Sequence, residues 1–321
     1  MIEILSNGAA NTVQDLGRFG HLDIGVSRCG AMDAAALTAG NALLGNESSA
    51  AGLEIAIFPF RLRFLSDIDV AVTGADCAAA LDGWRLPPFW AISARSGQEL
   101  KLSPPIAGAR AYVAFAGGID AAEILGSRST DLKGGFGGHK GRGLERGDRL
   151  GLAKIDGRRR KLPPGGLGAL PLDFPNAGEK TVDVRVTPGA EFDAFAQASI
   201  NCFFAAPWTV SAASNRMGYR LSGPLLTLTR RRELFSHGIL PGTIQVPASG
   251  QPIIQLADAN TCGGYPKIAH VIEPDLAKLA QTPAGARIRF HAATIATALE
   301  EAAKSKALLD DIRATAALIC G

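Results

Sequence analysis

The sequence has few features of a secreted, disulfide-linked protein. Its 321 residues include five cysteines, which are scattered and form no Cys-x-x-Cys pair. An odd number of isolated cysteines is typical of reduced thiols in the cytosol. The first twenty residues also lack the basic segment and the following apolar segment of a signal peptide. We therefore expect a cytoplasmic protein.

Long apolar runs and metal-ligand spacings are missing as well. No run approaches the roughly 18 apolar residues that a membrane span requires, so we expect no membrane partner. The five histidines show no His-Glu-x-x-His or other paired spacing, and we expect no metal site. With only three methionines and no Met-Lys-Met sequence, the chain is expected to carry no covalent biotin.

The excess of positive charge is small. There are 33 Lys and Arg against 30 Asp and Glu, a formal net charge of +3. This is too weak to favour nucleic acid as a partner, and the basic run at residues 156–166 ends in prolines and glycines, as a solvated linker does.

Glycine is abundant, with 38 residues, and apolar runs are short and punctuated. Several runs alternate polar with apolar residues, as half-buried antiparallel strands do. The spacing favours a barrel or sandwich, and we predict a mainly β fold with a few helices. The segments that read as strands are 2–6, 22–26, 60–65, 69–74, 98–103, 109–118, 181–189, 242–247, 252–258 and 286–292.

The longest stretch without periodicity, residues 157–180, separates two β-rich halves. We predict an N-terminal domain over 1–170 with one helix near 33–45. The C-terminal domain is predicted over 180–321. It includes a short helix at 190–200 and one or two amphipathic helices from about residue 294.

Three stretches carry enough polar chemistry to form a site. The first is 12–33, where Gln14, Asp15 and Arg18 can converge on one polar edge beside several glycines. In the alternative interpretation, Asp15 and Arg18 pair with each other and only fix the loop.

The second stretch is the glycine-rich segment 126–148, whose backbone N–H groups could bind an anion. Arg128, His139 and Arg142 add positive charge, so a carboxylate or phosphate fits. The segment lacks the GxxxxGK[ST] spacing of a P-loop, and a flexible lid is the alternative.

The third stretch pairs two loops, 214–226 and 255–271. Together they can hold a small amide or carboxylate through both donors and acceptors. In the alternative interpretation, Arg216 and Asp258 form a buried ion pair that pins two hairpins. The candidate residues of the two loops are Asn215, Arg216, Tyr219, Asp258, Thr261, Tyr265 and Lys267.

Five motifs occur in the order of the allophanate hydrolase subunit 2 family, which the chain resembles over residues 1 to about 292. That family includes the carboxyltransferase A/B region of urea carboxylase, the KipI antagonist KipA and the C-subunit of the ATP-dependent 5-oxoprolinase. The motifs are TVQDLGRFGHLDIGVSRCGAMD, GSRSTDLKGGFGGHKGR, SNRMGYRLSGP, GTIQVPASGQPIIQLAD and TCGGYPKIAHV.

The resemblance implies two cyclophilin-like β-barrel domains and a KipI-like (allophanate hydrolase subunit 1) partner. It also implies a LamB/YcsF-type third component and ATP with Mg²⁺. The implied reaction opens 5-oxo-L-proline to L-glutamate with ATP hydrolysis. Because an amide carbonyl is a poor electrophile, phosphorylating its oxygen would create a leaving group before water attacks.

Such a site needs cations for phosphate and neutral polar groups for the lactam. We expect Asp258 as base with Arg216 and Lys267, and phosphate contacts from Arg128, His139 and Arg142. The expected substrate contacts are Asn215, Tyr219, Thr261, Tyr265, Gln14 and Arg18.

Two other functions stay open. One is carboxyl transfer from a visiting carboxybiotin to a urea-like amide nitrogen. The other is a regulatory protein that binds and antagonises a KipI-like kinase inhibitor.

Overall fold

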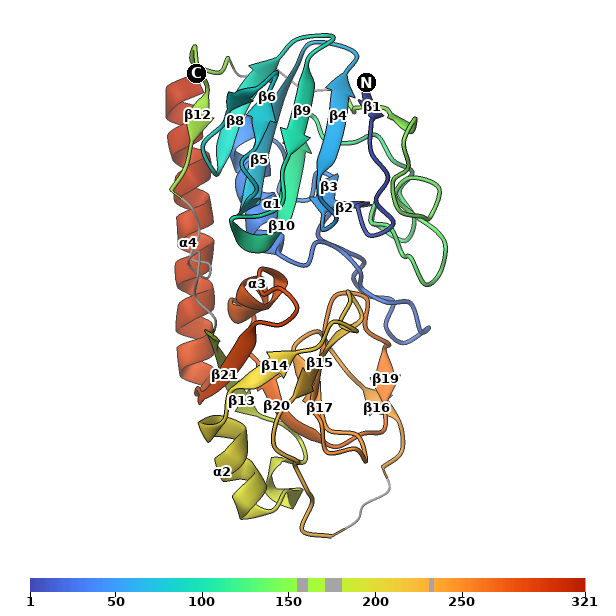
Figure 1. Cartoon of the computed structure of the whole chain (residues 1–321), viewed down its shortest axis with the longest axis vertical. Coiled ribbons are helices and arrows are strands. Elements are labelled where there is room, and N and C mark those ends of the chain that lie inside the picture. Colours follow the sequence, from blue (N-terminus) through green and yellow to red (C-terminus); the bar gives the residue numbers. More distant parts are fainter. Residues whose placement is uncertain (155–160, 171–180, 231–233, 321) are drawn as a thin grey trace. The chain divides into compact units, whose positions relative to one another are not determined.

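A computed structural model describes residues 1–154, 161–170, 181–230 and 234–320 (Figure 1). Its contacts divide the chain into two compact units. The first unit comprises Met1–Arg18, Cys29–Ala177 and Ser305–Gly321, and the second comprises Phe19–Arg28 and Gly178–Lys304.

Two segments belong to a different unit from the one predicted. Residues 19–28 group with the second unit and residues 305–321 with the first. The reason in the second case is α4 (Ile295–Cys320), whose residues Ile312 and Ala316 are buried in the first unit's hydrophobic cluster. One continuous helix therefore contributes to both units.

The first unit contains two antiparallel sheets around one hydrophobic core. Strand β4 shows why: Phe60, Leu62 and Phe64 are fully buried, while Arg61 and Arg63 alternate with them on the other face. One sheet has the order β11-β1-β4-β9-β6-β7, with bounds β1 (Ile2–Ile4), β4 (Phe60–Phe64), β6 (Ala80–Leu81), β7 (Trp84–Arg85), β9 (Glu99–Leu102) and β11 (Arg149–Leu150).

The other sheet is buried on both faces. Its order is β12-β8-β5-β10-β3-β2, with bounds β2 (Thr12–Gln14), β3 (Gly52–Ile55), β5 (Ile68–Asp76), β8 (Trp90–Ala94), β10 (Ala107–Phe115) and β12 (Leu167–Gly168). On β5, Val70 and Val72 enter the core between the sheets, whereas Ala71 packs with helix α1 (Ala34–Leu44) on the opposite face. Figure 1 shows α1 behind β5 and β10.

The helix predicted near 33–45 corresponds to α1. The Asp33 carboxylate caps it by accepting a hydrogen bond of 2.9 Å from the backbone N–H of Ala36. At the other end Gly45 has φ 73°, a left-handed conformation that ends the helix without a side-chain clash.

The second unit contains a closed barrel in the order β13-β20-β17-β18-β15-β14-β21. It closes through a parallel pairing of β13 with β21, while the other pairings are antiparallel. The bounds are β13 (Thr181–Pro188), β14 (Trp208–Val210), β15 (Gly218–Ser222), β17 (Thr243–Gln245), β18 (Ile253–Gln255), β20 (Lys267–Val271) and β21 (Arg287–Ala292).

Besides the first part of α4, this unit contains a short ribbon and three helical segments among the described residues. The ribbon pairs β16 (His237–Gly238) with β19 (Cys262–Gly263). The helical segments are η1 (Phe192–Ala194), α2 (Gln197–Ala205) and α3 (Asp275–Ala280). Helix α2 packs on β21, where the rings of Phe203 and Phe290 stack with centroids 4.5 Å apart.

The mainly β fold with few helices is confirmed. Strand pairing closes the barrel in the second unit, whereas the first unit's strands form two sheets around a common core. The short helix expected at 190–200 is divided into η1 and α2, and the C-terminal helix is continuous.

We expect Asp33→Ala to lower the free energy of unfolding by about 1 kcal/mol, because α1 loses the acceptor at its N-terminus. Urea denaturation measures the difference. Asp33→Ser is the matched control, since a hydroxyl also caps. If the serine variant is as unstable as the alanine variant, the capping explanation is wrong.

Candidate functional site

Arg216 and Asp258 form a buried ion pair in the second unit. Arg216 Nε and Nη2 each donate a 2.8 Å hydrogen bond to a different oxygen of the Asp258 carboxylate. The two side chains are 6% and 5% exposed. The Asp258 backbone N–H also donates to the Arg216 carbonyl, at 3.0 Å. The pair therefore fastens the loop before β15 to the loop after β18.

This geometry favours the structural interpretation of the pair. Both Asp258 oxygens accept hydrogen bonds from the Arg216 guanidinium and the pair is buried, so the carboxylate is directed at Arg216 rather than at an open site. The expectation that Asp258 acts as a base gains no support from these contacts.

Tyr219 and Asn215 of the same motif also make contacts within the fold. Tyr219 is 3% exposed, and its hydroxyl donates to the carbonyl of Thr282 at 3.1 Å. Asn215 is exposed, but its side-chain oxygen accepts a 2.9 Å bond from the Met217 N–H and stabilises the turn. Of the expected substrate contacts here, only Asn215 reaches the surface.

Lys267 lies in a different setting, on the outer face of the barrel. Ile244 and its register partners Ile254 and Ala269 are buried and fill the interior. Gln245 follows Ile244 and points to the other face. A bulge between Ile244 and Gln245 shifts the register here, so that Lys267, two residues before Ala269, pairs with Gln245 on the outer face.

A row of amides continues from Lys267 along this outer face. Gln255 Nε2 donates to Gln245 Oε1 at 3.0 Å. The β16–β19 ribbon covers the row, and a Cβ on Gly263 would lie 2.8 Å from the Gln245 amide nitrogen. Glycine therefore allows the ribbon to approach this closely.

Two residues that the sequence analysis did not select complete the cluster. His237 of the ribbon places Nε2 against Lys267 Nζ, and Glu191 Oε1 lies 3.8 Å from the same imidazole nitrogen. The other Glu191 oxygen accepts a 2.9 Å bond from the Lys267 backbone N–H. We name Glu191, His237, Gln245, Gln255 and Lys267 the lysine cluster.

Burial affects the basicity of the Lys267 amine. Desolvation lowers the pKa of Lys267 below its usual value, and the negative charge of Glu191 partly opposes this. A neutral lysine amine can accept a proton, which an ordinary exposed lysine rarely does near neutral pH.

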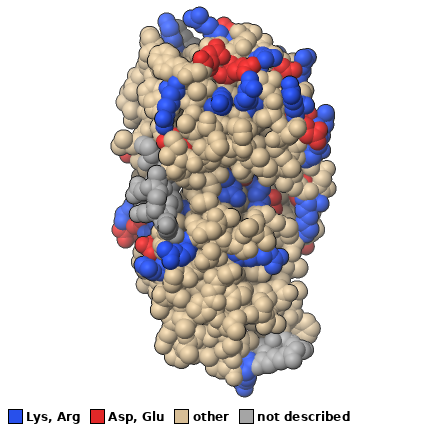
Figure 2. Space-filling model, in the orientation of Figure 1, with Lys and Arg blue, Asp and Glu red and all other residues tan. Residues whose placement is uncertain are grey.

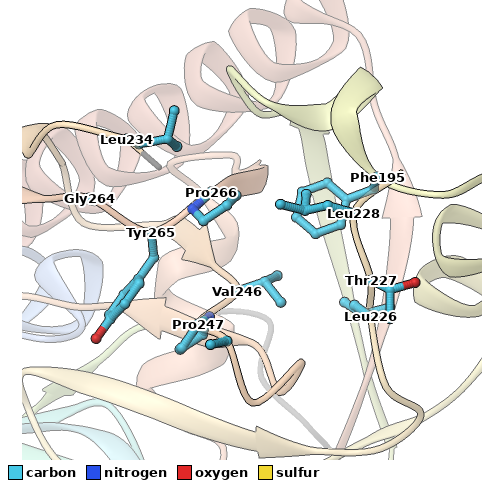
Figure 3. A pocket seen from close by; sticks show the side chains of 11 residues that line it. Phe195, Leu226, Thr227, Leu228, Leu234, Val246, Pro247, Gly264, Tyr265 and Pro266 are labelled. Atoms are coloured by element: carbon cyan, nitrogen blue, oxygen red, sulfur yellow. The ribbon is translucent and has the colours of Figure 1, made fainter. Parts of the chain in front are cut away.

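An apolar cavity of about 710 Å³ lies beside the segment that leads into β20 (Figure 3). Val246, Pro247 and Pro266 lie on one side, and Phe195 and Leu228 face them from the other. The Tyr265 ring lines the cavity while its hydroxyl points away from Phe195 and Leu228.

Thr261 and Tyr265 differ in how far they are exposed to solvent. Thr261 is half-buried, and its carbonyl accepts a hydrogen bond from the Ile239 N–H beyond the ribbon. Tyr265 is 52% exposed. Both lie on the segment that carries β19 and leads to Lys267, so Thr261, Tyr265 and Lys267 are grouped within one unit.

Gln14 and Arg18 lie in the first unit and are buried. Gln14 Nε2 donates to the Thr130 carbonyl at 3.3 Å, and Arg18 Nη2 donates to the Ser129 carbonyl. The Arg18 guanidinium also stacks over the Phe136 ring at 4.7 Å. Within the described residues, Gln14 Oε1 and Arg18 Nη1 have no hydrogen-bond partner.

Asp15 does not pair with Arg18, as the alternative interpretation supposed. Its carboxylate accepts hydrogen bonds from the hydroxyls of Ser127 and Ser129 and from the Arg128 and Gly17 N–H groups. Asp15 therefore organises the start of the glycine-rich segment.

The glycine-rich segment is tightly folded rather than an open lid. A Cβ on Gly138 would lie 1.9 Å from the Thr130 hydroxyl, and one on Gly141 would lie 2.1 Å from the Gly135 carbonyl. The N–H groups of Gly135, Gly138 and Gly141 donate to backbone carbonyls of the same segment. These donors are therefore not directed at a bound anion.

The three expected phosphate-binding cations already face carboxylates. Arg142 donates two 2.8 Å hydrogen bonds to Asp148, and His139 Nε2 lies 3.1 Å from the same carboxylate. Arg128 lies 3.0 Å from Glu123 at the surface. This arrangement does not fit a triphosphate, and we assign no nucleotide contact to these residues.

Charges of both signs also mix across the first unit, as Figure 2 shows for one face. On β4 and β9, Arg61 and Arg63 both contact Glu99, at 2.5 and 2.6 Å. The described residues hold no group of three or more His, Cys, Asp or Glu that could bind a metal ion. None of the described helices is long and apolar enough to cross a membrane.

Comparison with known proteins identifies the family to which the chain belongs. Residues 24–292 match the model described as "Carboxyltransferase domain, subdomain A and B". The chain belongs to this carboxyltransferase family.

Two relatives in the family match end to end. The 5-oxoprolinase C-subunit of Escherichia coli (strain K12) is 45% identical over 95% of this chain and 94% of the relative. The protein of the same name from Haemophilus influenzae is 41% identical over 98% of each chain.

A solved structure supports the fold. The urea amidolyase of K. lactis superimposes with a TM-score of 0.88 at 29% identity, over 97% of this chain. The matched region is 20% of that chain, so this family member spans about a fifth of the urea amidolyase.

The sequence offered little signal for His237 and Glu191. His237 is a single histidine without a second one at ligand spacing, and Glu191 is the second residue of the segment predicted as a short helix. Only the register of β17 with β20 and the ribbon over it bring both residues to Lys267.

We expect Arg216→Ala to lower the free energy of unfolding by about 3–5 kcal/mol, because Asp258 keeps a buried charge without its partner. Thermal and urea denaturation measure the loss. The control is Arg220→Ala, an exposed neighbour on β15, for which a change within about 0.5 kcal/mol is expected. A stable Arg216→Ala protein that fails only in substrate turnover would show that the pair acts in the reaction instead.

Because of Asp148, the free energy of unfolding should decrease as the pH falls in the acid range. Burial opposes ionisation of the Asp148 carboxyl, but hydrogen bonds from Arg142 and the Glu145 N–H, together with the nearby His139, outweigh burial and hold its pKa well below the usual range. Because the folded pKa is below the unfolded value of about 3.9, the stabilisation is complete above that pH and is lost as the pH falls below it.

We therefore expect Asp148→Asn to be less stable than the wild type by about 2 kcal/mol at pH 7. This difference should shrink between about pH 4 and pH 2. Urea denaturation at a series of pH values measures it. A difference that is the same at about pH 7 and about pH 2.5 would contradict the role of the ionised carboxylate.

Proposed function

We propose that this chain is the C-subunit of an ATP-dependent 5-oxoprolinase. Together with a KipI-like partner it would open 5-oxo-L-proline to L-glutamate. The observation that carries the proposal is the 45% identity to a 5-oxoprolinase C-subunit over 95% of this chain and 94% of that protein. An end-to-end match of this kind leaves no large domain of the relative unaccounted for.

The lysine cluster supplies a proton acceptor for this reaction. Opening a lactam consumes water, and the attacking water must give up a proton. The desolvated Lys267 amine is better suited to accept it than Asp258, whose oxygens are both held by Arg216. The amides of Gln245 and Gln255 and the hydroxyl of Thr261 add neutral groups that can orient a lactam.

We place the nucleotide outside the glycine-rich segment. ATP and Mg²⁺ belong to the proposed activity, but Arg142 and His139 are engaged by Asp148. The proposal is therefore a composite enzyme, whose site is completed by the KipI-like partner and a LamB/YcsF-type component. We propose the cytoplasm as its location, in line with the five free cysteines.

Carboxyl transfer to a urea-like amide nitrogen is the second candidate. It is favoured by the carboxyltransferase family match and the TM-score of 0.88 to urea amidolyase. This chain corresponds to 20% of that structure, and the reaction would also require a biotin carboxylase and a biotin carrier.

We expect the purified chain alone to form little glutamate from 5-oxo-L-proline and ATP. The complex with the KipI-like and LamB/YcsF-type components should form glutamate and ADP in equal amounts. Chromatographic detection of glutamate and a coupled ADP assay measure both products. In the complex, Lys267→Met should reduce turnover about 100-fold or more, the usual range for loss of a general base.

Assembly of the Lys267→Met complex, checked by size-exclusion chromatography, is the control for folding. Rapid turnover by the lone chain would contradict the composite site. If the complex leaves 5-oxoproline unchanged but carboxylates urea when a biotin carboxylase and carrier are added, the second candidate replaces the first.

A further inference from the structure

His237 and Lys267 form an unusual contact between two basic side chains. The imidazole Nε2 is within hydrogen-bond distance of the lysine Nζ. The residues come from separate elements, His237 from the ribbon and Lys267 from the barrel. The contact therefore depends on the ribbon lying over the outer face of the barrel.

The hydrogen bond restricts how many protons the pair can hold. An ammonium and an imidazolium both only donate, so one partner must be neutral for the bond to exist. His237 Nδ1 lies 3.0 Å from the Phe235 carbonyl, an acceptor. A neutral imidazole that donates from Nδ1 to this carbonyl presents the lone pair of Nε2 to Lys267.

The two side chains also differ in their access to solvent. Lys267 is 6% exposed, whereas the His237 side chain is 42% exposed. A proton leaving the buried amine through this contact therefore arrives on a ring that water reaches.

Within the part of the chain that the structure describes, few charged or titratable groups lie around the pair. Glu191, which precedes η1, lies 3.8 Å from His237 Nε2 and binds the Lys267 N–H. Gln245 on β17 is neutral. Cys262 lies on β19, in the register position opposite Gly238 of the ribbon. Among the described residues, Glu191 is thus a carboxylate that can balance a proton held by either base.

We propose that His237 is the proton-relay residue of the lysine cluster, connecting the Lys267 amine with solvent, and that Glu191 positions both. This inference rests on the proposed function, because it assigns the path of the proton released when water attacks the lactam.

The transfer balances within the pair. The neutral Lys267 amine accepts a proton from the attacking water and becomes an ammonium. The ammonium passes one proton to His237 Nε2 and is again neutral, while the imidazole becomes an imidazolium. The imidazolium then releases a proton to bulk water, and no other reactant is required.

The test uses His237→Ala in the reconstituted complex. We expect turnover of 5-oxo-L-proline to fall tenfold or more, because the amine loses its path to solvent. Imidazole added to the buffer should restore turnover with saturation, because the small base fills the space left by the ring. A residue with only a structural role would not respond to a soluble base.

The matched control is His291→Ala. His291 is also a half-exposed histidine of the second unit, 2.8 Å from Asp183. It should leave turnover unchanged and show no response to imidazole. The inference is overturned if His237→Ala turns over like the wild type, or if its lost activity does not respond to imidazole.

A second measurement does not depend on activity. Acetylation of Lys267 in the isolated chain, followed by mass spectrometry of its peptide across a pH series from neutral to strongly alkaline, gives the pH at which the amine becomes reactive. We expect this midpoint to lie lower in the folded chain than in the urea-unfolded chain, because burial lowers the pKa of Lys267. Equal midpoints would overturn the neutral amine on which the relay depends.

The two measurements separate the inference from the proposed function. A wild-type complex without turnover would refute the 5-oxoprolinase assignment, and the acetylation midpoint would still decide whether Lys267 is a neutral base. An active complex with a fully active His237→Ala variant would refute the relay alone.

Discussion

Successive side chains along a strand alternate between the two faces of a sheet, and the lysine cluster depends on a bulge that interrupts this alternation. Ile244, Ile254 and Ala269 fill the barrel interior, and Gln245 follows Ile244 on the other face. The bulge between Ile244 and Gln245 makes Lys267, two residues before Ala269, the register partner of Gln245. Outward groups normally meet water. Here the ribbon covers them, and the amine of Lys267 is desolvated without being enclosed in an apolar core.

Most of the other charged residues that suggested chemistry serve the fold. A charge removed from water needs a partner, because leaving it unpaired costs several kcal/mol. Arg216 and Asp258 meet this need by pairing, and Asp148 gathers Arg142 and His139. Lys267 differs from these residues because its buried amine contacts His237, a base that can be neutral, instead of two carboxylate oxygens.

The membership in the carboxyltransferase family and the arrangement of the site answer different questions. The family match and the end-to-end identity to a 5-oxoprolinase C-subunit support a substrate class and a multi-subunit enzyme. The structure of this chain indicates which of its side chains are placed to transfer a proton. The N–H groups of Gly135, Gly138 and Gly141 already donate to backbone carbonyls. This is why we propose that a partner subunit, rather than the glycine-rich segment, binds the nucleotide.

The sequence alone determined the mainly β character, the helix at 33–45 and the stretches that contain the site, because alternation, capping and glycine spacing are local properties. It also singled out Lys267 through its loop. It could not decide whether Arg216 and Asp258 meet, that Asp15 binds the serines rather than Arg18, or that His237 and Glu191 approach Lys267. Those contacts join residues 30 to more than 100 positions apart. Only strand register and burial, which are properties of the whole fold, decided them.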